Sequence, residues 1–434
     1  MKKYEAYKDS GVQWLGEIPS HWGLLPFKSN FILGKGLSIT KENLTETGTN
    51  VISYGQIHSK SNVVTKVVDD LYRHVSPDYI YTAPQCLTHK EDFLFADTSE
   101  DVEGSGNFVR IDNDETTFAG YHTIIARNRV PKNGHFLSYL FQSPKWKQQI
   151  WTKVHGVKVF SVSRGILNAC KIIVPPSNEQ QAIVSYLDDK CAKLDQLVTN
   201  KEKEIELLQE MKQRVIADAV TRGLNPNVKF KDTGISWLPQ IPEHWEFIKL
   251  KAFCKDNKEK NRDNVETQVL SLSYGKVIVK QNINFGLVPD SYETYQIVNP
   301  GYIILRLTDL QNDHKSLRTG LVKDRGIITS AYVGLIVKGM VSEYAQLMLH
   351  SYDIMKVFYG MGGGLRQSMG YQDISNLYIP VPPIDEQKAI VAYIEERVAK
   401  IDALSQKLQQ EIENIKEYKQ RLISDVVTGQ IKVC

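Results

Sequence analysis

The sequence has little of what would make it a secreted, membrane-spanning or disulfide-rich protein. It has only five cysteines in 434 residues, widely spaced and without a Cys-x-x-Cys pair, so neither a disulfide framework nor a structural zinc site is expected. No apolar run is long enough to span a bilayer, and the N-terminal MKKYEAYKDSG lacks the apolar stretch of a signal peptide. These absences predict a cytoplasmic protein whose thiols are reduced and mostly buried.

The common catalytic motifs are also missing. There is no Gly-x-x-x-x-Gly-Lys-Ser/Thr loop for a nucleotide and no Asn/Asp-Pro-Pro-Tyr/Phe stretch of the kind that holds a base in amino-methyltransferases. One weak nuclease-like pattern remains, in which Asp290, Asp313 and Lys315 have a spacing that could hold a magnesium ion. An autonomous endonuclease therefore stays open as an alternative function.

What the sequence does contain is an internal repeat. Residues 8–22 return at 231–245 with 9 of 15 positions identical, and residues 174–221 return at 381–428 with 24 of 48 identical. The segments between these blocks have diverged, although Ser53-Tyr54-Gly55 is echoed by Ser273-Tyr274-Gly275. A tandem duplication with preserved flanks and diverged middles predicts a shared structural framework that carries two domains with different roles.

The second preserved block of each copy is predicted to be a long helix. It follows a Pro-Pro pair and then runs for about 45 residues without proline or glycine. From Leu187 and from Ile394, steps of 4 and 3 give ten seam positions each, of which 8 are apolar. This pattern is typical of a coiled coil, with a core of roughly 33 residues and 50 Å. We expect the two helices to pair antiparallel and to hold the diverged domains at opposite ends, although packing of each helix on its own domain is the alternative.

The two diverged middles are predicted to form domains that contain both strands and helices. Each alternates short strand-like runs, such as NVISYGQI and QVLSLSYGKVIV, with one helical run, HFLSYLFQSPKWKQQI or EYAQLMLHSYDIMKVF. The predicted fold class is therefore α+β, with two mixed α/β domains separated by two long antiparallel coiled-coil helices. The predicted boundaries are 1–173 for the first domain, 174–224 for the first helix, 225–380 for the second domain and 381–434 for the second helix.

The charge distribution points weakly to a polyanion. The net charge is +3, but residues 178–224 and 384–434 together sum to −3, so the rest of the chain carries +6. A basic excess on the diverged domains favours nucleic acid as their partner, although an ordinary solvated surface would look similar. Loops rich in Lys, Arg, Gln and Ser precede both Pro-Pro pairs and could reach phosphates or base edges, or could simply be tight turns.

Taken together, the repeated Ser/Thr-Gly-Val/Ile-x-Trp-Leu-x-x-Ile-Pro-x-His-Trp, the repeated Pro-Pro-x-x-Glu-Gln-x-Ala-Ile-Val and the duplication resemble the DNA-specificity subunit of type I restriction-modification systems. The resemblance covers essentially the whole chain. It implies that two target-recognition domains each read one half of a split, asymmetric duplex DNA site. It also implies that the helices dock methylation and restriction subunits, and that the chain is not itself an enzyme. S-adenosylmethionine, ATP and magnesium would then be bound by the partners, with no cofactor or metal on this chain. A protein-only assembly scaffold is a further alternative.

The resemblance does not identify base-contacting residues, so the site predictions are positional. The DNA-binding candidates are Gly120, Tyr121, His122, Lys158 and Arg164 in the first domain and Ser330, Tyr332, Arg366 and Gln367 in the second. The partner-docking candidates are Gln180, Tyr186, Gln387 and Tyr393. For these four, core packing of the tyrosines and capping of the helix start by the glutamines are the structural alternatives. The repeated His21 and His244 are expected at a packing corner rather than in a metal site.

Overall fold

The structure is a computed structural model that describes residues 2–130, 133–280, 291–310, 317–361 and 368–433. The chain packs as two compact units, one formed by residues 1–200 with 410–434 and the other by residues 201–409. Each unit therefore contains one diverged middle together with parts of both long helices. Mixed helix and strand content in both units confirms the α+β prediction.

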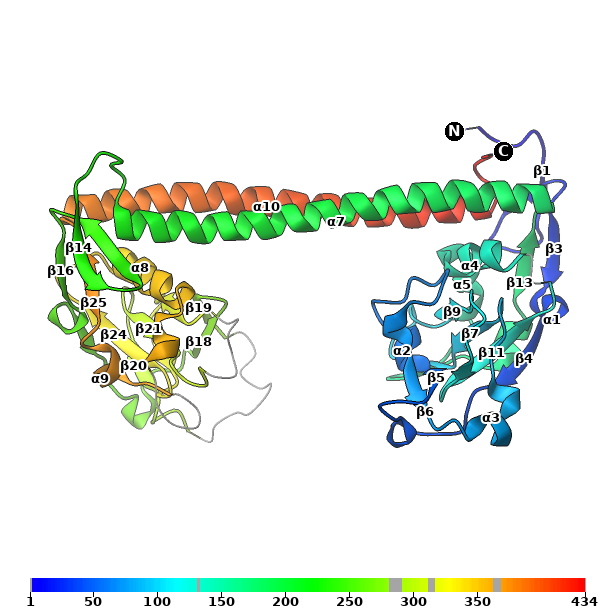
Figure 1. The fold of residues 1–434 in the computed structure, drawn as a ribbon, viewed down its shortest axis with the longest axis horizontal. Coiled ribbons are helices and arrows are strands. Elements are labelled where there is room, and N and C mark those ends of the chain that lie inside the picture. Colours follow the sequence, from blue (N-terminus) through cyan, green and yellow to red (C-terminus); the bar gives the residue numbers. More distant parts are fainter. Residues whose placement is uncertain (1, 131–132, 281–290, 311–316, 362–367, 434) are drawn as a thin grey trace. The chain divides into compact units, whose positions relative to one another are not determined.

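The first unit is built on a four-stranded antiparallel sheet with the order β4-β11-β7-β9 (Figure 1). A second sheet has the order β10-β5-β6, in which β10 and β5 are parallel. Helices α4 and α5 pack on the main sheet through an aromatic core that includes Phe93, Phe141 and Trp146. The elements of this unit are β4 (Phe31–Lys35), β5 (Thr49–Ile52), β6 (Arg73–Val75), β7 (Phe93–Ala96), β8 (Thr98–Ser99), β9 (Phe108–Arg110), β10 (Thr117–Ala119), β11 (Thr123–Asn128), β12 (Phe160–Ser161), α1 (Phe27–Asn30), α2 (Tyr54–Ile57), α3 (Tyr79–Thr82), α4 (Gly134–Gln142), α5 (Pro144–Trp151) and α6 (Arg164–Asn168).

The second unit repeats this plan with shorter strands. Its main sheet has the order β17-β24-β21-β22, is antiparallel throughout and is covered by α8. A hairpin β18-β19 and a pair β20-β23 lie beside it (Figure 1). The bounds are β17 (Cys254–Asp256), β18 (Leu270–Ser273), β19 (Lys276–Val279), β20 (Gln296–Val298), β21 (Ile303–Leu305), β22 (Thr319–Leu321), β23 (Gly326–Ile328), β24 (Val333–Val337), α8 (Ser342–Ile354) and α9 (Tyr371–Ile374).

The first preserved block of each repeat forms a small frame. A hairpin, β1-β2 or β14-β15, is followed by a strand, β3 or β16, that pairs with the strand leading into a long helix, β13 or β25. Pairing across more than 100 residues closes each diverged middle into a loop that starts and ends at the same place. The bounds are β1 (Tyr7–Asp9), β2 (Glu17–Pro19), β3 (Gly23–Pro26), β13 (Lys171–Val174), β14 (Phe230–Ile235), β15 (Leu238–Pro242), β16 (Glu246–Lys249) and β25 (Tyr378–Val381).

The repeated Ile-Pro-x-His-Trp motif fastens this frame to a helix start. His21 Nε2 lies 2.6 Å from Glu179 Oε1, and the buried Trp22 donates from Nε1 to Glu179 Oε2 at 2.9 Å. In the second unit, His244 Nε2 lies 2.8 Å from Glu386 Oε2. The two preserved blocks therefore contact each other in both units, and the half-exposed His21 and His244 join them through a polar contact with a glutamate rather than by packing.

The long helices are α7 (Ser177–Arg222) and α10 (Ile384–Val427). The predicted seam positions, from Leu187 to Ala219 and from Ile394 to Val426, are all buried or half-buried, while most other middle positions are exposed. Two lysines in this seam reach aspartates on the opposite helix: Lys419 with Asp195 at 2.6 Å, and Lys212 with Asp402 at 2.7 Å. These residues are related by the repeat, so each unit contains the same ion pair with the helix roles exchanged.

Two local predictions were wrong. The run NVISYGQI is strand only to Ile52, because Ser53 begins a capping box and α2 follows. The first helical run is two helices, separated at Pro144, whose ring sits where helices tolerate it, in the first turn of α5.

The thiols behave as predicted: Cys86, Cys170, Cys191 and Cys254 are free and buried. Within the described ranges, no helix is both long enough and apolar enough to cross a membrane.

Candidate nucleic-acid interface

The predicted AGYHT segment of the first domain forms the turn that precedes β11. Gly120 donates its backbone N–H to the Ile52 carbonyl at 2.8 Å, and its carbonyl accepts from Thr123 Oγ1 at 2.7 Å. A Cβ at Gly120 would lie only 2.0 Å from Ser53 Oγ, so this position requires glycine. The absence of a side chain at Gly120 therefore allows the turn to lie close to the Ser53-Tyr54 segment.

His122 is presented by this turn to the surface. Its backbone is left-handed, with φ of 55°, and its exposed ring lies 3.1 Å, Nδ1 to Oδ1, from Asp97. The ring centroid is 5.4 Å from that of Tyr54, which in turn is 5.6 Å from Tyr121. A non-glycine residue with positive φ costs backbone energy, and such positions cluster at functional sites.

A cavity of about 840 Å³ lies beside these rings, lined among others by Tyr54, His58, Asn107 and His122. His58 Nε2 lies 2.8 Å from the Thr98 carbonyl, which can only accept, so Nε2 carries the proton. The other ring nitrogen, Nδ1, then accepts from Asn107 Nδ2 at 3.1 Å. The side chains of His58 and Asn107 in the cavity wall are thus held in a hydrogen-bonded network.

This hydrogen-bonded network ends at the buried amine of Lys147. Lys147 Nζ donates to Asn107 Oδ1 at 2.5 Å, and burial lowers the pKa of Lys147 to about 8. The lining of the cavity also includes the exposed residues Glu100, Asp101 and Glu103. These acceptors suit the amino groups of bases and disfavour phosphate.

The predicted Lys158 lies close to the same cavity along the chain. Its neighbour Val159 lines the cavity, and β12, which follows, pairs with β8 so that Phe160 lies opposite Ser99. Lys158 itself is exposed. Arg164 is exposed as well but begins α6, one element further on. The fold thus brings Gly120, Tyr121 and His122 together with the segment that carries Lys158.

The predicted Ser330 and Tyr332 occupy the matching turn of the second domain, directly before β24. Lys260 Nζ donates to Ser330 Oγ at 2.7 Å and to the Thr294 carbonyl at 3.3 Å. The Tyr332 carbonyl accepts from Gln296 Nε2 at 2.8 Å, while its half-buried side chain packs on the core beside β23. The candidate turn therefore has the same place in both sheets but different side chains.

A basic segment beside this turn was missed by the sequence reasoning. Residues 249–262 carry six basic and two acidic side chains, and Lys255, Lys258, Lys260 and Arg262 are all exposed. This local run of basic residues is visible in the sequence, but a net charge summed over both domains does not reveal it. Tyr292 and Tyr295 lie next to the segment with ring centroids 5.1 Å apart, which gives the combination of cations and rings that suits nucleic acid.

Several predicted residues lie outside the described residues. These are the DNA-binding candidates Arg366 and Gln367 and the nuclease-like Asp290, Asp313 and Lys315. Among the residues that the structure does describe, no group of three or more His, Cys, Asp or Glu side chains is arranged to hold a metal ion.

The docking candidates lie at the two helix starts. Gln180 and Gln387 each donate from Nε2 to the carbonyl of a preceding proline at 2.8 Å, and Gln387 also accepts from the Val341 N–H at 2.9 Å. Gln387 is only 1% exposed, so it holds the helix start from within. Tyr186 and Tyr393 are half-buried against the cores, and each ring is covered by a cation one turn further on.

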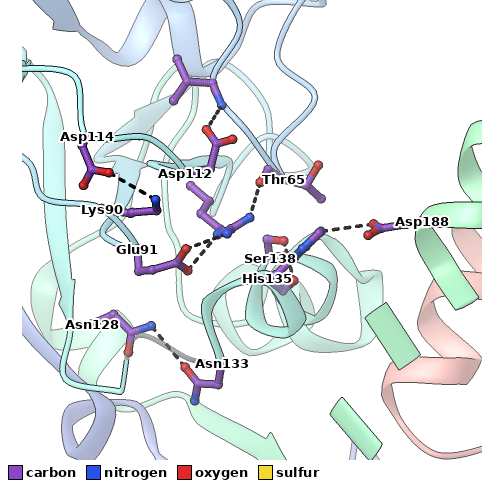
Figure 2. A network of polar contacts seen from close by, with 12 residues as sticks. Thr65, Lys90, Glu91, Asp112, Asp114, Asn128, Asn133, His135, Ser138 and Asp188 are labelled. Carbon is purple, nitrogen blue, oxygen red and sulfur yellow. Dashed lines mark hydrogen bonds and ion pairs between the residues drawn. The ribbon is translucent and has the colours of Figure 1, made fainter. Parts of the chain in front are cut away.

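A polar network fixes the first domain to α7 (Figure 2). His135 Nε2 lies 3.2 Å from Asp188 Oδ1, and the Tyr139 hydroxyl donates to the same oxygen at 2.6 Å. Burial raises the pKa of Tyr139 and lowers that of His135. Nearby, Arg110 forms two bonds to Glu91, at 2.7 and 3.0 Å. Because His135 and Tyr139 both contact Asp188 of α7, these two side chains orient the first domain on its helix.

Comparison with known proteins identifies the family. The model of the type I restriction modification DNA specificity domain matches twice, at residues 27–207 and 242–414. A putative type I restriction enzyme MjaX specificity subunit from Methanocaldococcus jannaschii is 24% identical over 444 residues, covering 99% of this chain and 98% of that protein. The EcoBI specificity subunit of Escherichia coli is 23% identical over 315 residues, covering 66% of this chain and 64% of that protein.

Solved structures show the same fold. A chain from a study of complex assembly and conformational transition in a type I restriction-modification system superposes with a TM-score of 0.67 at 15% identity, covering 95% of this chain and 99% of that one. The HsdS subunit of Thermoanaerobacter tengcongensis superposes with a TM-score of 0.51 at 15% identity, covering 95% and 98%.

The fold and its two matched repeats define a protein that carries two related DNA-specificity domains on one chain. The chain belongs to the type I restriction-modification DNA specificity family. Its function is DNA target recognition as a specificity subunit, and catalysis in these systems is carried out by partner subunits.

Proposed function

We propose that the chain reads a split, asymmetric duplex DNA target, with residues 1–173 reading one half and residues 225–380 the other. The observation that carries this proposal is the position of the candidate turns. Gly120-Tyr121-His122 and Ser330-Ala331-Tyr332 precede the equivalent strands β11 and β24 of two sheets with the same order. Equal placement with different side chains is what two readers of different half-sites require.

Electrostatics supports separate roles for the surfaces. The exposed basic segment of the second domain suits the phosphate backbone, which supplies affinity without sequence information. The rings and acceptors around the cavity of the first domain suit base edges. We therefore assign positioning to Lys255, Lys258 and Arg262, and direct readout to the turns.

We further propose that residues 174–224 and 381–434 dock the methylation and restriction subunits. Exposed apolar side chains on both helices, which a solvated coiled coil does not need, support this role: Leu197 (43% exposed), Leu207 (55%), Met211 (51%), Leu404 (46%) and Tyr418 (45%). Gln180, Tyr186 and Tyr393 lie near the helix starts, where they can join such a surface, whereas Gln387 would act by holding its helix start. S-adenosylmethionine, ATP and magnesium would be bound by these partners in the cytoplasm.

A domain exchange tests the split-target proposal. Residues 32–165 of the chain are replaced by the corresponding segment of a family member with a different target, and the chimaera is expressed with the methylation subunits. Sequencing of methylated adenines should show one new half-site and one unchanged half-site. The reciprocal exchange of the corresponding middle of the second domain, residues 255–372, is the matched control and should change only the other half.

The alternatives give different outcomes in the same experiment. If both half-sites change in one exchange, the two-reader proposal is wrong. A protein-only scaffold would give methylation at positions that do not depend on either middle. No comparison supports an autonomous endonuclease, which would instead cleave plasmid DNA with magnesium in the absence of partners.

A further inference from the structure

The β18-β19 hairpin of the second unit has an unusual tip. Ser273 pairs with Lys276, so Tyr274 and Gly275 form a two-residue turn with φ of 46° and 75°. Two positive φ values define the turn type in which Asn-Gly is favoured, because most side chains are strained at its first position. Tyrosine is not a residue that this backbone selects.

The tip is held in place while the tyrosine side chain is left in solvent. A Cβ at Gly320 would lie 2.5 Å from Leu272, so the inner face of the hairpin packs closely on β22. A Cβ at Gly275 would similarly lie 3.1 Å from Leu317 Cβ. Tyr274, by contrast, is 89% exposed. The backbone around the tip is therefore held in place, and the ring is presented to solvent.

The surroundings of the ring are cationic and apolar. Lys276 lies on β19 and Lys280 directly after it, and both are exposed. Between them, Ile278 and Val279 are 46% and 40% exposed. Tyr274 also lines a cavity of about 480 Å³ together with Lys323 and with Lys212, which is paired with Asp402. Two carboxylates, Glu343 and Glu395, lie in the same lining. An exposed ring beside lysines is an arrangement that can stack on a base while the cations contact the phosphates.

We propose that Tyr274 is a base-stacking residue of the second recognition domain, which inserts its ring against an unstacked or partly unstacked base step of the half-site that this domain reads. The proposal rests on DNA recognition by this domain as proposed above. The Ser-Tyr-Gly of the first repeat differs, because Tyr54 is half-buried and lies against His122 and Tyr121. The two readers thus use the same repeated tripeptide in different ways.

The test separates the ring from the backbone. The full chain, assembled with its methylation subunits, is titrated with the target duplex found by mapping methylated adenines. Tyr274→Ala should weaken specific binding about tenfold or more, and Tyr274→Phe should bind within about twofold of the parent, because stacking needs the ring and not the hydroxyl. Tyr274→Asn removes the ring but suits the turn, so it should lose the same affinity while its melting temperature is unchanged or higher.

Salt dependence supplies a second readout. Loss of a stacking contact should leave the slope of log affinity against log salt unchanged, whereas Lys276→Ala, the comparison variant, should reduce the magnitude of that slope by about one unit. Methylation by the Tyr274→Ala complex should relax at the second half-site and stay strict at the first.

Each other outcome overturns the proposal. If Tyr274→Ala and Tyr274→Asn bind the target within twofold of the parent, the ring does not stack on DNA, and DNA recognition by the domain is unaffected. If these variants fail to assemble with the methylation subunits while the isolated chain keeps its DNA affinity, Tyr274 is a protein contact. If the parent complex shows no sequence preference, both this proposal and the split-target proposal fail.

Discussion

The end of α10 provides a sharp test of how the N-terminal hairpin is seated. Gly429 follows this helix with φ of 75°, and its carbonyl accepts from the Tyr7 hydroxyl at 2.9 Å. A Cβ at this position would lie 2.4 Å from Pro19 Cδ and 3.1 Å from Trp22 Cζ3. The neighbours are a proline ring and a fully buried indole, neither of which can rotate away.

Gly429→Ala should therefore carry two penalties. Holding alanine at this φ costs roughly 1–2 kcal/mol, and displacing the packed rings adds roughly 1–3 kcal/mol, which gives about 2–5 kcal/mol in total. Gly11→Ala is the matched control in the same unit, because Gly11 has φ of 66° but nothing within 4 Å of its Cβ position. It should show only the first penalty, about 1–2 kcal/mol.

Two glycines of the second unit allow an independent comparison of the same kind. Gly223 ends α7 with φ of 74°, and its Cβ would lie 3.1 Å from Glu386 Oε1 and from Trp245 Cζ2. Gly234 has the same φ of 74° and open space around it. Because a 3.1 Å approach can be relieved by small shifts, Gly223→Ala should exceed Gly234→Ala by less than about 1 kcal/mol.

Urea unfolding gives the total free energy for each variant, and hydrogen exchange in the peptide that contains residues 422–433 reports the local effect. At about 2–4 °C per kcal/mol for a unit of this size, the melting temperatures of Gly429→Ala and Gly11→Ala should differ by several degrees. Equal destabilisation of the two variants would refute the reasoning, because it would mean that the hairpin does not pack on the end of α10.

The remaining predictions concern the helices and pH. Lys419→Glu should cost about 0.5–1 kcal/mol and Asp195→Lys in the same chain should restore it, as measured by a double-mutant cycle; additive costs would show that the pair does not couple. Burial lowers the pKa of His350 from 6.5 to about 4. The unfolded state therefore binds a proton that the folded state does not between those values, so stability should fall by about 2–3 kcal/mol as pH drops from 6.5 to 4, and His350→Gln should remove that slope. If the helices set the distance between half-sites, duplicating residues 187–193 and 394–400 adds about 10 Å and should lengthen the preferred spacer by roughly three base pairs or weaken methylation; an unchanged spacer at full activity would refute this role.

The preserved parts of the protein were predictable from the sequence, because their patterns are local and occur twice. A seam repeated every 3.5 residues between Pro-Pro and glycine specifies a long coiled-coil helix without reference to other contacts, and the exposure of α7 and α10 follows it. The family resemblance depended on the same blocks and was confirmed by the two matched regions.

Tertiary structure decided what local patterns leave open. Lys260 meets Ser330 across 70 residues, and Glu179 meets His21 across 158, so neither contact has a signature in sequence spacing. Tyr54 and Tyr274 occupy the same repeated tripeptide, yet one begins a helical turn and the other caps a hairpin, because different neighbours pack beneath them. The sequence by itself determined the framework through periodicity and repetition. Only long-range packing determined which side chains the framework presents, since a surface is formed by residues that the fold, and not the chain, makes neighbours.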